Sequence, residues 1–151
     1  MASGIVEPRR GVDVGRVVTD LVVENFEDVS RARRGEIPAS QIRSISLLAM
    51  ANSGATYLCL PKSVVQQLEL TLQRTRESRT LMGTFAAGLY AAARVQVSAR
   101  DCVTEVKEIP DGHRPLPGQI PLEMMDFWID LAAQKLVGNP EYGGEWMAEV
   151  M

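Results

Sequence analysis

The chain has 151 residues, of which 46% are hydrophobic and 23% charged, and its formal net charge is −3. This length and composition predict one globular domain, and no apolar run approaches the roughly 20 residues of a membrane-spanning helix. The N-terminus lacks the apolar core of a signal peptide, so the sequence favours a cytoplasmic protein with no membrane partner.

Extended segments dominate the first half of the chain. Residues 16–25 are rich in β-branched side chains and predict a strand. Residues 27–38 are polar and predict turns, and residues 41–50 predict a second strand that ends at Asn52. Pro61 then suits the first turn of a short helix, because its missing N–H needs no partner there.

The second half of the chain continues as short elements separated by turns. Residues 83–88 are small except for Phe85 and include two glycines, which predicts the tip of a long hairpin. The other expected elements are the hairpin strands (70–82 and 89–98), a strand at 102–109, a short helix at 122–125, and strands at 127–131 and 134–137. Short strands, frequent turns and two brief helices together predict a mostly β fold.

Few residues suit metal binding or nucleophilic catalysis. Cys59 and Cys102 have no metal-ligand spacing and are expected to be buried apolar side chains. His113 is the only histidine and lies in a turn-like segment, without a motif for a serine or cysteine hydrolase around it. The basic run at residues 31–34 has no aromatic residue within it. The sequence therefore predicts no metal, no cofactor and no nucleic-acid partner.

Asn52 is the most informative residue, because Asn52-Ser53-Gly54-Ala55 would match the Asp-Ser/Thr-Gly-Ala signature of aspartic proteases if it began with Asp. Leu58-Cys59-Leu60-Pro61 leads out of this segment into a predicted helix, and Leu116-Pro117-Gly118 precedes the second helix. In this order the segments resemble retropepsin-like (retroviral-type) aspartic proteases, in particular the small bacterial members. Asn52 stands at the position of the catalytic Asp.

The resemblance implies a fold and an assembly. The expected fold is a mostly β, retropepsin-like closed β-barrel with a flap hairpin and one or two short helices. A single signature per chain implies a homodimer whose two copies together form one site. Residues 1–15 are expected to form an N-terminal arm and residues 16–151 the retropepsin-like aspartic protease domain.

The resemblance also assigns roles to individual residues. The implied site comprises Asn52, Ser53 and Gly54 at the catalytic position, Ala55 and Thr56 in the substrate cleft, Met82, Gly83, Thr84, Phe85 and Ala86 in the flap, and Leu116, Pro117 and Gly118 beneath the catalytic loop. The implied partners are a second copy of the chain and a peptide or protein substrate.

The amide of Asn52 decides what such a site does. In an aspartic protease two carboxylates about 3 Å apart share one proton, and the ionised one activates a water. An amide cannot act as this base near neutral pH. The sequence therefore predicts an aspartic endopeptidase domain that is inactive as written but still binds peptide.

Three alternatives stay open. The first is a natural non-catalytic module for peptide binding or dimerisation, which is favoured by the unusual Ala51 and Pro117. The second is a heterodimer with an active paralogue, which would still lack one carboxylate. The third is an unrelated β protein in which Asn52 is only a turn residue.

Overall fold

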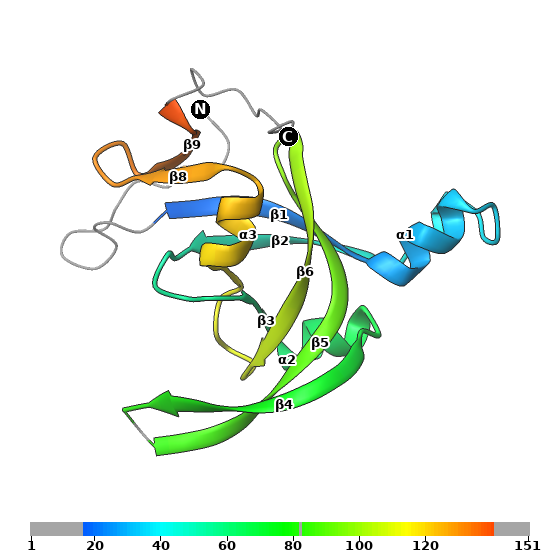
Figure 1. Ribbon diagram of the computed structural model, residues 1–151, viewed down its shortest axis with the longest axis horizontal. Helices are drawn as coiled ribbons and strands as arrows, with labels where there is room; N and C mark the ends of the chain where they lie inside the picture. Colours follow the sequence, from blue (N-terminus) through cyan, green and yellow to red (C-terminus); the bar gives the residue numbers. More distant parts are fainter. Residues whose placement is uncertain (1–16, 82, 141–151) are drawn as a thin grey trace, which may run out of the picture.

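The computed structural model describes residues 17–81 and 83–140, and within them the predicted mostly β fold is confirmed (Figure 1). The elements are β1 (Val17–Asn25), α1 (Phe26–Arg33), the 3₁₀ turn η1 (Ala39–Gln41), β2 (Ser44–Ala51), β3 (Leu58–Pro61), α2 (Lys62–Gln67), β4 (Thr71–Thr80), β5 (Gly83–Val97), β6 (Arg100–Ile109), β7 (Leu116–Pro117), α3 (Gln119–Met124), β8 (Phe127–Asp130) and β9 (Lys135–Gly138). None of the helices in these residues is long and apolar enough to cross a bilayer.

One large sheet runs in the order β2-β1-β5-β6-β3-β7, and β4 pairs with β5 outside this path. Strands β8 and β9 form a separate ribbon. The segment around β7 also bonds back to β2, because the Met50 N–H donates to the Pro115 carbonyl at 2.9 Å and the Asn52 N–H to the Pro117 carbonyl at 3.2 Å. These bonds join the two ends of the sheet, so the barrel is nearly closed.

The barrel interior follows from the alternation of side chains along each strand. In β6, Cys102, Thr104 and Val106 are buried and the residues between them are half-buried, as the sequence pattern predicts. The largest fully buried side chains include Leu21, Leu58, Leu60, Leu68, Leu89 and Met125. Each such side chain contributes roughly 1.5–3 kcal/mol of hydrophobic stabilisation.

The prediction of turns at residues 27–38 is confirmed only for residues 34–37, because helix α1 extends to Arg33. The Asn25 side chain caps this helix by accepting the Asp28 N–H at 3.2 Å. Glu27 and Asp28 lie in the first turn and arginines in the last, an arrangement that complements the helix dipole. The described residues thus contain three α-helices, whereas one or two were predicted.

The long hairpin is present, but its tip is not at residues 83–88. These residues belong to β5 and pair with β4, from Gly83 opposite Thr80 to Gly88 opposite Thr75. The glycines and alanines of this stretch suggested a loop, but their backbones pair with β4 across the hairpin. The predicted strands at 127–131 and 134–137 are confirmed as β8 and β9. The helix predicted at 122–125 is α3, which begins earlier, at Gln119.

Candidate functional site

The candidate site is built around the loop of residues 52–57, which joins β2 to β3 and is called the Asn52 loop below. Asn52, Ser53 and Gly54 are exposed, and Asn52 Oδ1 accepts the Gly54 N–H at 2.8 Å. The Ala55 N–H donates to the Asn52 carbonyl at 3.1 Å, which closes a tight turn. The amide side chain therefore stabilises the conformation of its own loop.

The segment from Leu116 to Gly118 lies against this loop. Leu116 and Pro117 pair with β3, and the Gly118 N–H donates to the Tyr57 carbonyl at 3.0 Å. A Cβ at Gly118 would lie 2.4 Å from the Tyr57 carbonyl oxygen and 2.6 Å from that of Ala55. The backbones approach so closely that only glycine fits here.

Helix α3 completes the support of the loop. The N–H groups of its first two residues, Gln119 and Ile120, donate to the carbonyls of Ala55 at 2.7 Å and Thr56 at 3.0 Å. Ala55 is half-buried and Thr56 is exposed. The structure thus brings residues 52–56 and 116–118, which were predicted as separate parts of one site, into direct backbone contact.

A groove of about 580 Å³ lies beside the tip of the Asn52 loop. Its lining residues come from the loop, from α3 and from β8: Ser53, Gln119, Leu122, Glu123, Phe127, Trp128 and Ile129. Several large hydrophobic side chains remain exposed on the same two elements or next to them: Ile120, Met124, Trp128 and Leu131. The loop tip is therefore bordered by an apolar surface, which we call the loop-side face.

The predicted flap residues lie in the hairpin of β4 and β5, which projects from the barrel as a two-stranded arm (Figure 1). Gly83, Thr84, Phe85 and Ala86 pair with residues 80, 79, 78 and 77 of β4. Met82 lies outside the described residues. Toward the body, the Arg76 guanidinium of β4 donates to the Tyr57 hydroxyl at 3.0 Å. Residues 83–86 lie between this contact and the tip of the hairpin.

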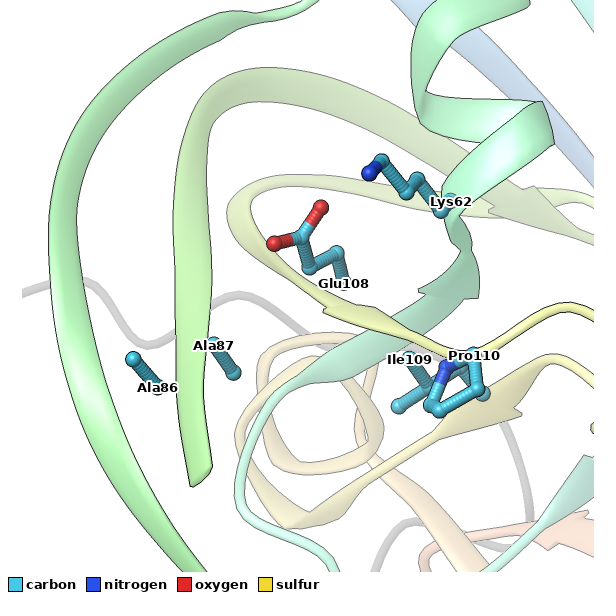
Figure 2. Close-up of a pocket in the computed structure, with 6 residues that line it drawn as sticks. All are labelled: Lys62, Ala86, Ala87, Glu108, Ile109 and Pro110. Atoms are coloured by element: carbon cyan, nitrogen blue, oxygen red, sulfur yellow. The ribbon is translucent and has the colours of Figure 1, made fainter.

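A carboxylate holds the base of this arm. Glu108 accepts the Gly88 N–H and the Tyr90 hydroxyl, each at 3.0 Å, at the position where β5 stops pairing with β6. Burial and the neighbouring Glu108 raise the pKa of Tyr90. Figure 2 shows Glu108 and Lys62 reaching into one space of about 250 Å³, with Ala86 and Ala87 of β5 on its other side.

A second pocket, here called the arm pocket, lies between the arm, β6 and the end of the Asn52 loop. It has a volume of about 520 Å³ and is lined by Tyr57, Thr75, Arg76, Glu77, Leu89 and Lys107. The sequence did not identify these residues as functional, because they come from four separate segments and belong to no motif. The pairing of the strands brings them together.

The remaining reactive groups are placed as the sequence predicted. Cys59 and Cys102 are buried free thiols. Burial raises the pKa of Cys59, although the Lys107 ammonium acts in the opposite direction, and burial raises the pKa of Cys102 to about 11. Both thiols are therefore protonated and weakly nucleophilic near neutral pH. His113 is exposed in the turn after β6.

The described residues contain no group of three His, Cys, Asp or Glu side chains that could hold a metal ion. In the Asn52 loop the side chains that can form hydrogen bonds are an amide and three hydroxyls, those of Asn52, Ser53, Thr56 and Tyr57. This set can donate and accept hydrogen bonds, but it provides no carboxylate that could act as a base.

Comparisons with known proteins complete the description of the site. No protein-family model matches the chain, and no curated protein does. Among solved structures, the chain is similar to the solution structure of the simian foamy virus (mac) protease. The two share 23% sequence identity and a TM-score of 0.42, over 52% of this chain and 81% of that one. A likeness of this size leaves activity and residue roles unassigned.

Proposed function

We propose that this chain is a retropepsin-like domain that binds an extended peptide between the Asn52 loop and the hairpin arm and does not cleave it. The observation that carries the proposal is the loop itself. It is an exposed turn, fixed from below by β7 and α3, and it presents an amide at its tip. The amide takes the place at which a protease of this kind needs a carboxylate.

Hydrolysis fails in this proposal for a chemical reason. Attack of water on a peptide carbonyl needs a group that removes a proton from the water. Neither Asn52 nor the hydroxyls of the loop can do so near neutral pH, and the Asn52 oxygen already accepts the Gly54 N–H. Two copies of this loop would still contain no base.

Peptide binding is supported by one edge of the arm. Among the described residues, the stretch of β5 at residues 84–87 pairs with β4 and not with β6. An extended peptide can pair with such an edge by β-strand addition.

A homodimer forms the complete site in this proposal. Support comes from the loop-side face, because Ser53 borders its groove and four large hydrophobic side chains remain exposed around it. An isologous interface would bury this face on both copies and bring the two Asn52 loops together. Exposed apolar surface of this kind is typical of an interaction site.

A second candidate is a natural peptide-binding or dimerisation module that differs from an active protease at more positions than Asn52. It is favoured by Ala51 and Pro117. Both are buried next to the loop, and the resemblance leads us to expect a larger aliphatic residue at position 51, as at position 50, and an aliphatic residue at position 117. Under this reading, restoring the carboxylate alone would leave the protein inactive.

One substitution tests the proposal and separates the candidates. Asn52→Asp is nearly isosteric and should fold, and it should create peptidase activity against a mixed peptide library assayed from pH 4 to pH 8. We expect an optimum on the acidic side of neutral, because the pair of carboxylates works while it holds one proton. Asn52→Ala is the control, since it alters the loop without supplying a base.

Three results can be distinguished. Cleavage by the Asp variant alone supports a protease domain inactivated at Asn52. A folded, dimeric and inactive Asp variant favours the natural binding module. Equal cleavage by the unchanged protein and the Asp variant would refute the mechanism.

A further inference from the structure

The arm pocket contains two cationic side chains that form no ion pair with any described residue. We infer that this pocket receives a carboxylate of the bound peptide and that Arg76 and Lys107 bind it. The inference deepens the proposed peptide-binding function and rests on it, because it specifies which peptides the site selects.

The arm lies over the outer face of β6. The interior of the barrel takes Cys102, Thr104 and Val106, so Glu105 and Lys107 lie together on the opposite face. Arg74 of β4 forms an ion pair with Glu105 at 3.0 Å. Two residues further along β4, Arg76 reaches Tyr57. These two contacts place Lys107 beneath the arm, in the pocket that Arg76 also lines.

The charges in this region do not balance. Glu105 is paired with Arg74, whereas the contact of Arg76 is with a neutral phenol hydroxyl. Lys107 is half-buried, and its ammonium forms no hydrogen bond or ion pair with any described residue. The two positive charges that line the pocket therefore form no ion pair with a carboxylate of the described residues.

Glu77 also lines the pocket but does not supply the missing charge. It follows Arg76 directly in β4, and side chains of consecutive strand residues point to opposite faces. Arg76 reaches the Tyr57 hydroxyl, and no ion pair joins Glu77 to Arg76 or Lys107 among the described residues. The negative charge has to come with the ligand.

A carboxylate fits this arrangement better than a neutral group. A partly desolvated ammonium gains from an ionised partner, and a guanidinium can bind the same carboxylate through two N–H groups. In β-strand addition the backbone pairing provides affinity and the pockets provide sequence preference. The arm pocket is thus the part of the site that selects an acidic residue, or the free C-terminus, of the peptide.

The test uses the full chain immobilised and two pools of randomised decapeptides. One pool is acetylated and C-terminally amidated, so that Asp and Glu side chains are its only carboxylates, and the other carries free C-termini. Retained peptides are identified by mass spectrometry. We expect at least threefold enrichment of Asp or Glu at one position of the amidated pool, as for a partly exposed ion pair. If peptides are retained only when they carry a free C-terminus and only when Lys107 is present, the terminal carboxylate is the group that the arm pocket binds.

Variants separate charge from structure. Lys107→Gln and Arg76→Gln should each reduce the enrichment, Lys107→Arg should retain it, and Lys107→Glu should replace it with enrichment of Lys or Arg. Arg33→Gln is the control, because it removes an exposed arginine at the end of α1. Circular dichroism checks that each variant is folded, and the reversal by Lys107→Glu cannot result from unfolding.

The outcomes separate the inference from the function on which it rests. If the unchanged protein retains no peptide from either pool, peptide binding itself is refuted and the inference with it. If peptides are retained without an acidic or terminal preference, or if the preference survives Lys107→Gln and Lys107→Glu, only the inference about the arm pocket is refuted.

Discussion

Gly118 is the residue whose identity the structure explains most directly. It has no Cβ at a point where one would lie 2.4 Å from a carbonyl oxygen of the Asn52 loop. Its neighbours are backbone atoms, which cannot rotate away as a flexible side chain would. The same residue donates an N–H to Tyr57, so it both permits and fixes the close approach of β7 to the loop.

We therefore expect Gly118→Ala to destabilise the protein by about 1–3 kcal/mol, the usual cost of overpacking a closely packed site. Urea unfolding followed by circular dichroism measures the change. Thr56→Ala in the same loop is the control, because its side chain is exposed and should change stability by less than about 0.5 kcal/mol. Equal stabilities of Gly118→Ala and the unchanged protein would show that the loop can move away at no cost.

The site shows which residues a sequence can reveal. Asn52 and Leu116 to Gly118 belong to recognisable segments, and the resemblance implied that the second segment lies beneath the loop, where the Pro117 carbonyl accepts the Asn52 N–H. Tyr57, Arg76 and Lys107 carry no such pattern. They form one pocket only because β4 folds over β6, a relation between residues far apart in the chain.

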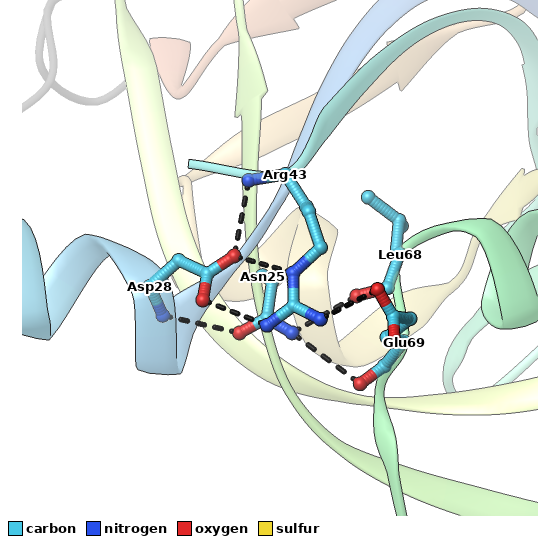
Figure 3. A network of polar contacts seen from close by, with 5 residues as sticks. All are labelled: Asn25, Asp28, Arg43, Leu68 and Glu69. Atoms are coloured by element: carbon cyan, nitrogen blue, oxygen red, sulfur yellow. Dashed lines mark hydrogen bonds and ion pairs between the residues drawn. The ribbon is translucent and has the colours of Figure 1, made fainter. Parts of the chain in front are cut away.

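At the scale of elements, helix α1 shows why some local structure was missed. Its cap, Asn25, also donates to the Leu68 carbonyl at 2.9 Å, and its buried Asp28 accepts three hydrogen bonds from Arg43, at 2.7, 2.8 and 3.0 Å (Figure 3). A helix of 8 residues is marginal on its own, so these contacts with distant segments stabilise it. The alternating strands, in contrast, could be predicted from their own residues.

The Asp28–Arg43 contact also makes stability depend on pH. The Arg43 hydrogen bond holds the pKa of Asp28 below its usual range, against the opposing effect of burial. Because the folded-state pKa is depressed, the stabilisation is fully present above the unfolded-state pKa of about 3.9 and is lost as pH falls through the folded value.

Asp28→Asn should therefore lower the free energy of unfolding near pH 7 by about 1–3 kcal/mol, since a charged acceptor of three hydrogen bonds is replaced by a neutral group. The difference from the unchanged protein should shrink as pH falls below 4. Urea unfolding at pH 7, 5 and 3 measures it. Glu27→Gln is the control, because Glu27 is an exposed carboxylate in the same helix. A difference that stays constant across these pH values would contradict the role given to the Asp28 charge.

At the scale of the whole molecule, the end of the barrel that carries the Asn52 loop has an exposed apolar surface. The Asn52 loop is fixed from below by β7 and α3, but its tip is exposed beside an apolar groove. Trp128 on β8 is 50% exposed and Leu131, just beyond that strand, is 59% exposed. A second copy packed on this loop-side face would bury these side chains and place two loops together, which is the geometry that a shared peptide site requires.

We expect the protein to be a dimer at tens of micromolar in sedimentation equilibrium, and Trp128→Glu to weaken the dimer at least tenfold. A large aromatic side chain near the centre of an interface commonly contributes 2 kcal/mol or more to binding, and 1.4 kcal/mol already corresponds to a tenfold change. Leu48→Glu is the matched control, because Leu48 is 51% exposed on β2 but does not line the groove. An effect of equal size from both substitutions would mean that added charge, rather than loss of the loop-side contact, weakens association. A monomer at these concentrations would remove the shared site and, with it, the place where Asn52→Asp could create a catalytic pair.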